Sequence, residues 1–253
     1  MRDYRLYCKL YKHNINLGTA SLTITGTGNF TGSKTVPFNI VQEAPTITFN
    51  DITKTYGDAD FNLTATSSST GAFTYTIADA SVATVTGSTT TIVGAGTTTV
   101  TVSQAADSNY NSATATMTLT VNPADIANST IAAIADQTYT GSAITVSPTV
   151  TFNSTTLSET TDYTVSFTNN INVGTASLTI TGIGNFTGSK TVPFNIVQAA
   201  PTITFNDITK TYGDADFNLT ATSSSTGAFT YTIADASVAT VTGSTTTIVG
   251  AGT

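Results

Sequence analysis

A long, nearly identical internal repeat constrains this chain more than any other feature. Residues 14–97 recur as residues 170–253, and 81 of these 84 positions are identical. The three exceptions are Leu17/Val173, Thr27/Ile183 and Glu43/Ala199. Solenoid repeats are about 20–50 residues long, whereas the two copies here are offset by 156 residues. The sequence therefore predicts a duplicated block of whole domains.

The repeating block divides into two kinds of module. A proline without an N–H suits a linker, and prolines recur at the joints Pro45, Pro123 and Pro201. We name residues 44–122 module Y and residues 123–199 module X, and we predict that each is complete. Residues 1–43 are predicted to be the C-terminal part of another X-type module. Residues 200–253 are predicted to be the N-terminal part of a second Y-type module.

Alternation of apolar and polar residues predicts β-strands throughout the chain. Threonine makes up 60 of the 253 residues, and its β-branched side chain suits the exposed face of a strand. Four rows have apolar residues at every second position: Phe73, Tyr75 and Ile77; Met117, Leu119 and Val121; Tyr163, Val165 and Phe167; Val36, Phe38 and Ile40. We predict an all-β fold of tandem Ig-like β-sandwich modules, beads on a string, with incomplete modules at both ends.

Glycine and proline add local detail to this prediction. Turns are predicted at Gly57-Asp58, Thr86-Gly87-Ser88, Gly94-Ala95-Gly96 and Gly141-Ser142. Pro37 lies inside the fourth apolar row. Because proline cannot donate a ladder hydrogen bond, it predicts an edge strand there.

Charge restricts the partners of the chain. Charged residues make up only 9%, against about 25% in ordinary globular domains, and the net charge is −7. Nucleic acids and anionic membranes need clustered Lys and Arg, so neither is expected as a partner. No apolar run reaches the length of about 18 residues that a membrane helix needs. The chain is expected to be a monomer, and its N-terminus lacks the apolar segment of a secretory signal.

The first residues do not fit the repeat. By the offset, residues 7–13 correspond to residues 163–169, but the two stretches differ. Codons for Thr-Val-Ser-Phe-Thr-Asn, read in another frame, can encode Cys-Lys-Leu-Tyr-Lys, which is the sequence of residues 8–12. A frame shift near the start is therefore one interpretation of residues 1–13, and an unrelated extension is the other. Sequencing the gene decides between them.

Stretches of both modules resemble a known class of domain. Module Y carries ITKTYGDADFNLTATSSS and ASVATVTGSTTTIVGAGTTTVTV, and module X carries QTYTGSAITVSPTVT and TASLTITGIGNFTGS. These stretches resemble the bacterial Ig-like and MBG-type modules that occur in tandem in large surface proteins of the adhesin type. The resemblance implies a cell-surface or secreted location and a role as a spacer or adhesive stalk. It implies no catalytic residue.

The residue types needed for nucleophilic catalysis are almost missing. Cys8 is the only cysteine and His13 the only histidine. The second copy has Asn169 in place of His13, so the repeat itself contains no imidazole. Ser–His and Cys–His catalysis and Cys/His zinc sites are therefore not expected. The sequence predicts no enzyme and no cofactor.

One acidic cluster is a candidate for calcium. Alternate carboxylates on one strand face could supply oxygen ligands to Ca²⁺. The candidates are Asp51, Asp58 and Asp60, with their repeats Asp207, Asp214 and Asp216. The competing interpretation is that Asp58 and Asp60 close a turn through side-chain hydrogen bonds. An EF-hand pattern does not occur here.

Two functions remain open from the sequence. The first is a non-catalytic structural spacer or stalk. The second is a binding module that recognises a glycan or a surface protein through its inter-strand loops. The chain has no Trp, and most Tyr and Phe lie on the alternating apolar rows, which favours the spacer.

Overall fold

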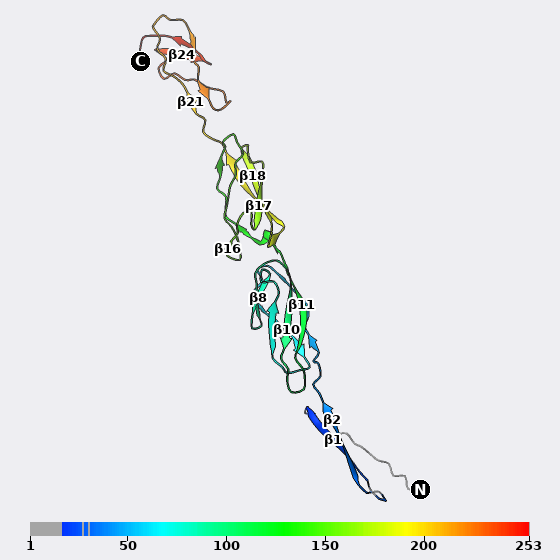
Figure 1. Cartoon of the computed structure of the whole chain (residues 1–253). Coiled ribbons are helices and arrows are strands. Elements are labelled where there is room, and N and C mark those ends of the chain that lie inside the picture. Colours follow the sequence, from blue (N-terminus) through cyan, green and yellow to red (C-terminus); the bar gives the residue numbers. More distant parts are fainter. Residues whose placement is uncertain (1–16, 27, 30, 253) are drawn as a thin grey trace. The chain divides into compact units, whose positions relative to one another are not determined.

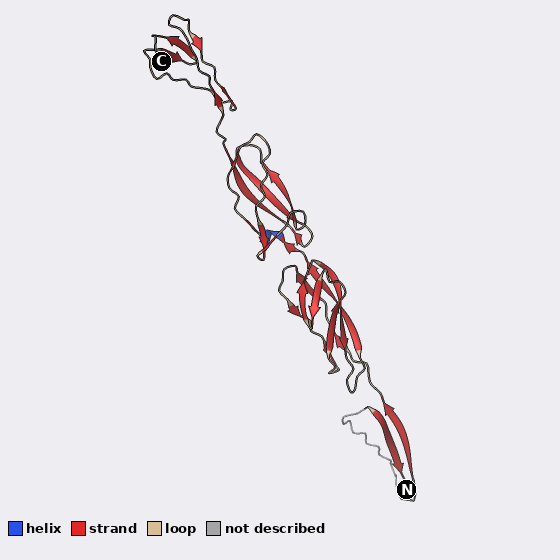
Figure 2. Cartoon of the chain, turned by 60° about the vertical axis from the view of Figure 1, so that its left-hand side comes forward, coloured by secondary structure: helices blue, strands red, loops and turns tan. Residues whose placement is uncertain are grey.

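The computed structural model describes residues 17–252 except 27 and 30, and their regular elements are nearly all strands (Figure 2). The one helical element in this part of the chain is the 3₁₀ turn η1 (Ile126–Asn128). The Asp125 side chain caps η1 by accepting a hydrogen bond from the Ala127 N–H at 2.9 Å. The predicted all-β class is confirmed. Cys8, His13 and the proposed frame shift lie outside the described residues.

The chain forms two compact units. The second comprises Ala135–Thr145, Asn169–Ala176 and Phe194–Thr253, and the other described residues belong to the first. This division crosses residues 123–199, because long strands of that segment run from one unit into the other. It does not test the predicted module boundaries, which stay a prediction. Module Y lies wholly in the first unit.

Module Y consists of short strands in two main sheets (Figure 1). One sheet has the order β4-β11-β10-β7, a second has the order β5-β9-β8, and β3 pairs with β6. The strands are β3 (Ile47–Thr48), β4 (Ile52–Thr55), β5 (Phe61–Asn62), β6 (Thr66–Ser67), β7 (Phe73–Ile77), β8 (Ala83–Thr86), β9 (Thr89–Ile92), β10 (Gly96–Gln104) and β11 (Ala113–Asn122).

The strand order of module Y is that of an immunoglobulin sandwich. In a constant-type Ig domain, strands A, B, E and D form one sheet and strands C, F and G form the other. Here β3 takes the place of strand A, β6 and β5 together that of strand B, β9 that of E and β8 that of D, so these strands pair in the order A-B-E-D. Strands β7, β10 and β11 take the places of C, F and G. In addition, β4 pairs with β11 in parallel. The Ig-like prediction for module Y is therefore supported by its own topology.

The two faces of the β10–β11 pair explain the threonine content. Outward threonines lie opposite each other across the pair, as in Thr99↔Thr118 and Thr101↔Thr116. Inward residues of both strands, such as Val100 and Met117, are buried. Uncharged threonine therefore covers the outer face, while the inner face joins the core. That core consists of Leu63, Val82, Ala83, Val100, Met117, Leu119 and Val121.

The buried threonine Thr90 leads to a prediction about the stability of module Y. The Thr90 side chain is fully buried on β9, and its hydroxyl has no hydrogen-bond partner in the described part of the chain. A buried hydroxyl without a partner costs about 1–3 kcal/mol. We expect Thr90→Val, which keeps the shape, to stabilise module Y by about 1 kcal/mol. Slower amide exchange in β8 and β9 would show the gain, whereas faster exchange would contradict it.

Residues 123–199 fold into strands of the same general kind. Their main sheet has the order β14-β20-β18-β17, a second sheet has the order β13-β15-β16, and β12 pairs with β19. The strands are β12 (Ala124–Asp125), β13 (Thr130–Ile131), β14 (Gln137–Thr138), β15 (Val150–Phe152), β16 (Thr155–Thr156), β17 (Tyr163–Thr168), β18 (Gly174–Gly182), β19 (Phe186–Thr187) and β20 (Ser189–Val197).

Module X shares part of the topology of module Y. Its β14 lies parallel to the last long strand β20, as β4 lies parallel to β11 in module Y. The fourth strand differs, because β17 directly precedes its partner β18, whereas β8 and β9 intervene between β7 and β10. The core of module X consists of Ala124, Ile126, Val150, Leu157, Tyr163, Leu178, Ile180 and Phe186.

The N-terminal part forms a hairpin whose apolar side chains stay exposed. It consists of β1 (Gly18–Thr25) and β2 (Ser33–Ile40). Leu22 is 45% exposed, whereas its repeat in module X, Leu178, is 1% exposed. Phe38 is 47% exposed, against 3% for Phe194. The same sequence thus forms the same hairpin with and without a covering sheet.

The C-terminal part repeats the first strands of module Y. Its strands are β21 (Ile203–Thr204), β22 (Phe217–Asn218), β23 (Thr222–Ser223), β24 (Ala239–Thr242) and β25 (Thr245–Ile248). The pairings β21–β23 and β22-β25-β24 repeat those of β3–β6 and β5-β9-β8. Ile203 is 58% exposed and Phe205 50% exposed, whereas Phe49, the repeat of Phe205, packs against the core of module Y.

The turns predicted from glycine and the edge strand predicted from proline can be compared with the structure. Gly57, Gly87 and Gly141 have positive φ angles of 88°, 63° and 80°, which fits the predicted turns, because L side chains avoid that region. The edge-strand prediction holds for Pro37, since β2 has β1 as its partner in a two-stranded sheet. For Pro193, which repeats Pro37, the edge-strand prediction is only partly right. Its strand β20 is internal to the sheet, but the neighbouring strand β14 pairs only with Ile196 and Val197 and leaves Pro193 unpaired on that side.

Candidate functional site

The predicted calcium residues are held in turns and strand contacts. The Asp58 carboxylate accepts a hydrogen bond from the Thr55 N–H at 2.9 Å, and Asp214 accepts one from the Thr211 N–H at 3.0 Å. These bonds agree with the turn interpretation. Asp51 instead accepts a bond from the Thr118 N–H of β11 at 2.7 Å. For Asp60, Asp207 and Asp216, the calcium prediction rests on the sequence only.

A metal site needs several of these carboxylates together. No group of three His, Cys, Asp or Glu side chains that could hold a metal occurs among the residues described. The calcium prediction remains open, and titration of the chain with CaCl₂ in a calorimeter tests it.

The best-organised polar cluster surrounds Asp107, a residue that the sequence reasoning missed. Its Oδ2 accepts hydrogen bonds from the Ser69 hydroxyl at 2.9 Å and from the Thr70 N–H at 2.9 Å. Its Oδ1 accepts from the N–H groups of Asn109 and Tyr110, both at 2.8 Å. One carboxylate therefore ties the β10–β11 loop to the loop after β6. The Asp-Ser-Asn-Tyr-Asn stretch at residues 107–111 was the sequence signal for such a turn.

The loop that Asp107 orders also holds the linker that enters module Y. The Gln42 side chain donates a hydrogen bond to the Asp107 carbonyl at 2.8 Å. The Glu43 N–H donates to the Asn109 carbonyl at 3.1 Å, and the Asn111 N–H donates to the Glu43 carbonyl at 2.9 Å. The linker therefore adds a short bridge to this loop.

Hydrogen bonding lowers the pKa of Asp107 and predicts how its loop responds to acid. The N–H groups of Asn109 and Thr70 hold the pKa of the Asp107 carboxyl far below its ordinary value of 3.8. A carboxylate with a depressed folded pKa stabilises the fold above its unfolded pKa, and this is lost as pH falls through the folded pKa. We expect the Asn109 and Tyr110 amide signals to stay constant from pH 7 to about 4 and to shift only at lower pH. Asp107→Asn should abolish this titration, and a midpoint at or above 4 would contradict it.

A second polar group is buried beside this cluster. Gln104, at the end of β10, is 2% exposed. Its Oε1 accepts a hydrogen bond from the Ser67 hydroxyl at 2.6 Å, and its Nε2 donates to the carbonyls of Ser69 and Gly71 at 3.1 and 3.0 Å. These partners all lie within module Y, so Gln104 helps to order the fold of that module.

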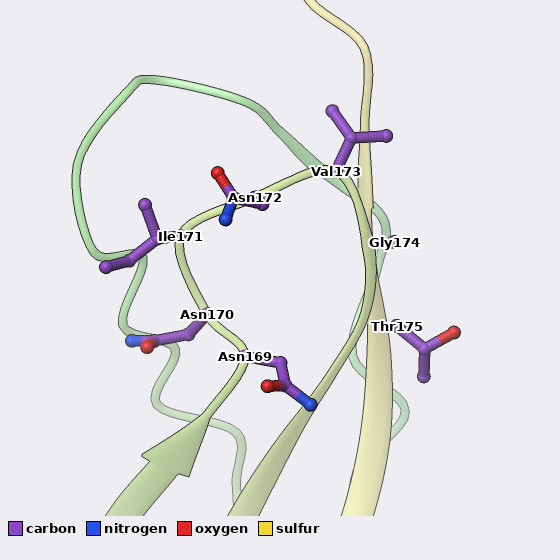
Figure 3. Close-up of a pocket in the computed structure, with 7 residues that line it drawn as sticks. All are labelled: Asn169, Asn170, Ile171, Asn172, Val173, Gly174 and Thr175. Carbon is purple, nitrogen blue, oxygen red and sulfur yellow. The ribbon is translucent and has the colours of Figure 1, made fainter.

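A hollow in module X is lined by the loop between β17 and β18 (Figure 3). Its volume is about 500 Å³, and its lining residues are Asn169, Asn170, Ile171, Asn172, Val173, Gly174 and Thr175. The Asn170 side chain is already used, because it donates to the Ile144 carbonyl at 2.8 Å. Ile171 and Val173 are about half exposed. The hollow offers amide groups without an aromatic platform or a charged side chain.

Side chains suited to nucleophilic catalysis are scarce in this sequence. The chain's only thiol and only imidazole, Cys8 and His13, lie outside the described part. Burial raises the pKa of the Tyr163 hydroxyl, and the negative charges of Glu159 and Asp162 raise it further. That hydroxyl therefore stays protonated at neutral pH and is a poor nucleophile.

Comparisons with known proteins give distant structural matches. No family model and no curated protein sequence matches the chain. A titin I-band fragment, I67–I69, matches with 13% identity and a TM-score of 0.34, covering 73% of this chain and 75% of that one. Cadherin domains 1–4 of protocadherin gamma B7 match with 16% identity and a TM-score of 0.29, covering 72% and 57%. Domains EC1–4 of Drosophila N-cadherin match with 14% identity and a TM-score of 0.29, covering 68% and 55%.

The similarity to these structures is too low to transfer a function. All three are chains of consecutive domains by their names, and this chain spans a little over half of the two cadherin structures. The Ig-like description rests instead on the strand order of module Y. No helix in the described ranges is long and apolar enough to cross a membrane.

Proposed function

We propose that this chain is a non-catalytic spacer segment of a cell-surface or secreted repeat protein, of the bacterial MBG-type adhesin class. The observation that carries the proposal is the path of the chain through module Y. The chain enters at Glu43, which bridges to Tyr110 in the β10–β11 loop. It leaves after Asn122, beyond the pair Gly96↔Val121 at the other end of the same two strands.

A module that is entered at one end and left at the other adds its length to the chain. The nine residues of β10 rise about 30 Å at roughly 3.4 Å per residue. Each 156-residue block of two modules would then add about 60–80 Å, including turns. The uncharged threonine face suits this role outside the cell, because little of the stability depends on ion pairs that salt would screen.

Small-angle X-ray scattering of the full chain tests the spacer proposal. A compact domain of this length would have a radius of gyration of about 18 Å. Modules joined end to end should give roughly 30 Å or more, because their strands alone reach about 100 Å in total. A value near that of the compact domain would rule the spacer out.

The alternative function is recognition of a glycan or a surface protein through loops. The asparagine-lined hollow between β17 and β18 favours it, since amides pair well with sugar hydroxyls. The lack of an aromatic platform weighs against it. Glycan-array binding by the full chain that Asn172→Ala abolishes would establish this function, and absence of binding would leave the spacer as the better account.

A further inference from the structure

Within the first compact unit, the end of module Y where the chain leaves contacts module X through specific hydrogen bonds. The Asn185 side chain accepts a bond from the Ala95 N–H at 2.8 Å. The Asn153 side chain donates one to the Gly57 carbonyl at 3.1 Å. Both bonds join residues that are more than 85 positions apart, at 90 and 96 residues. Each amide side chain of module X thus reaches a backbone group of module Y.

Aromatic packing joins the same two ends. The Tyr56 ring lies 5.4 Å from the Phe186 ring in an edge-to-face arrangement, and Phe186 meets Phe152 in the same way at 5.2 Å. Tyr56 packs against the buried clusters of both modules. Edge-to-face pairs add to the stabilisation that comes from burial alone. Tyr56 therefore belongs to two cores at once.

Glycine permits the close approach. A methyl group at Gly57 would lie 2.7 Å from the Phe152 ring and 2.9 Å from the Asn153 amide nitrogen. A methyl group at Gly94 would lie 2.7 Å from the Ser81 carbonyl oxygen of module Y itself and 3.2 Å from the Asn185 side-chain oxygen. The Y end therefore has room for Phe152 and Asn153 of module X because Gly57 carries no side chain, whereas Gly94 is needed first by its own module.

We propose that the Y end, defined by Tyr56, Gly57, Gly94 and Ala95, is a docking surface for the X end, defined by Phe152, Asn153, Asn185 and Phe186. The partner that it fits is an X-type module, which supplies two asparagine side chains and two phenylalanines packed edge to face. The surface recurs without change at Tyr212, Gly213, Gly250 and Ala251, where Tyr212 is 68% exposed. This second surface takes an X-type module in the same way. The inference concerns the contact itself and does not depend on the role as a spacer.

The repeat supplies a matched pair of variants. Gly57 and Gly213 have similar φ angles of 88° and 97°, so alanine meets the same backbone strain at both. At Gly213, however, a methyl group meets nothing within 4 Å. In the full chain, Gly57→Ala should speed exchange of the Ala95 amide about fivefold or more, the effect of losing one hydrogen bond. Gly213→Ala should leave that amide unchanged, and equal effects of the two variants would overturn the proposal.

Side-chain chemistry at Asn185 gives an independent test. Asn185→Ala removes the acceptor of the Ala95 bond, whereas Asn185→Asp keeps an oxygen there. The first should release the Ala95 amide and the second should preserve its protection. Asn29 occupies the same place in the exposed N-terminal hairpin, so Asn29→Ala is the control and should change nothing at Ala95. Slow exchange of Ala95 in Asn185→Ala would show that the contact does not exist in solution.

Extending the chain tests the second surface. Adding the sequence of residues 98–199 after Thr253 completes the second Y module and places an X module after it. Gly213→Ala should then become as disruptive to Ala251 exchange as Gly57→Ala is to Ala95 exchange. If Gly213→Ala stays silent in the extended chain, the recurrence of the docking surface is wrong.

Discussion

Replacing Leu178 by alanine should destabilise module X by about 3 kcal/mol, within the range of roughly 2–5 kcal/mol for buried leucines. Leu178 is 1% exposed, pairs with Phe167 across β17 and β18, and lies in the core with Ile180 and Tyr163. Alanine there loses the transfer free energy of the removed carbons and leaves a cavity. The expected result is faster exchange of the β17 and β18 amides by about two orders of magnitude.

The control for Leu178 has the same neighbours in sequence but not in space. Leu22 occupies the equivalent place in β1 and is 45% exposed. Leu22→Ala should cost less than about 1 kcal/mol, as for other exposed side chains. Global melting would mix several modules, which do not unfold as one two-state system, so exchange must be followed by peptide mass spectrometry. Equal losses from the two variants would mean that Leu22 is buried in solution.

Replacing Gln104 by leucine should destabilise module Y by about 2–4 kcal/mol. The substitution keeps the volume but removes the partners of the Ser69 and Gly71 carbonyls and of the Ser67 hydroxyl. Each buried polar group left without a partner costs about 1–3 kcal/mol. We expect the Gly71 region and the end of β10 to exchange faster than the rest of module Y.

An exposed glutamine provides the comparison for Gln104. Gln198 lies exposed in the linker before the second Y-type part, so Gln198→Leu makes the same chemical change without burial. That variant should lie within about 0.5 kcal/mol of the parent chain. If Gln104→Leu were equally harmless, the carbonyls of Ser69 and Gly71 would have to be satisfied by water.

The strands were predictable from the sequence because their signal is local. The rows through Phe73 and Met117 place an apolar side chain at every second position, and β7 and β11 follow these rows. The strand order was not predictable to the same degree, because it depends on which segments cover each other. The sequence around Tyr163 does not indicate that β17 pairs with the next strand, β18. In module Y, by contrast, β7 pairs with β10, three strands later.

The polar sites also include local hydrogen bonds that the sequence shows and long-range ones that it does not. The turn bond of Asp58 spans three residues and is visible in the sequence. The local turn bonds of Asp107 to Asn109 and Tyr110 could be expected from the sequence. Its bonds to Ser69 and Thr70, and the bond of Gln104 to Ser69, join residues more than thirty positions apart and could not. The exposure of Leu22 and Ile203 likewise depends on distant segments, since a sheet without its partner leaves apolar area in water.

Because residues 44–97 and 200–253 are identical, the two copies can compete during folding for the same strands. Residues 98–122, which form most of β10 and all of β11, directly follow the first copy, and the second copy offers an identical acceptor to the same hairpin. Closing the intervening chain of 77 residues costs the distant acceptor about 4 kcal/mol. Order of synthesis also favours the near one, because it is complete about ten seconds earlier at usual rates of translation. Refolding from denaturant removes that head start, but the loop-closure cost still favours pairing with the near acceptor by about a thousandfold.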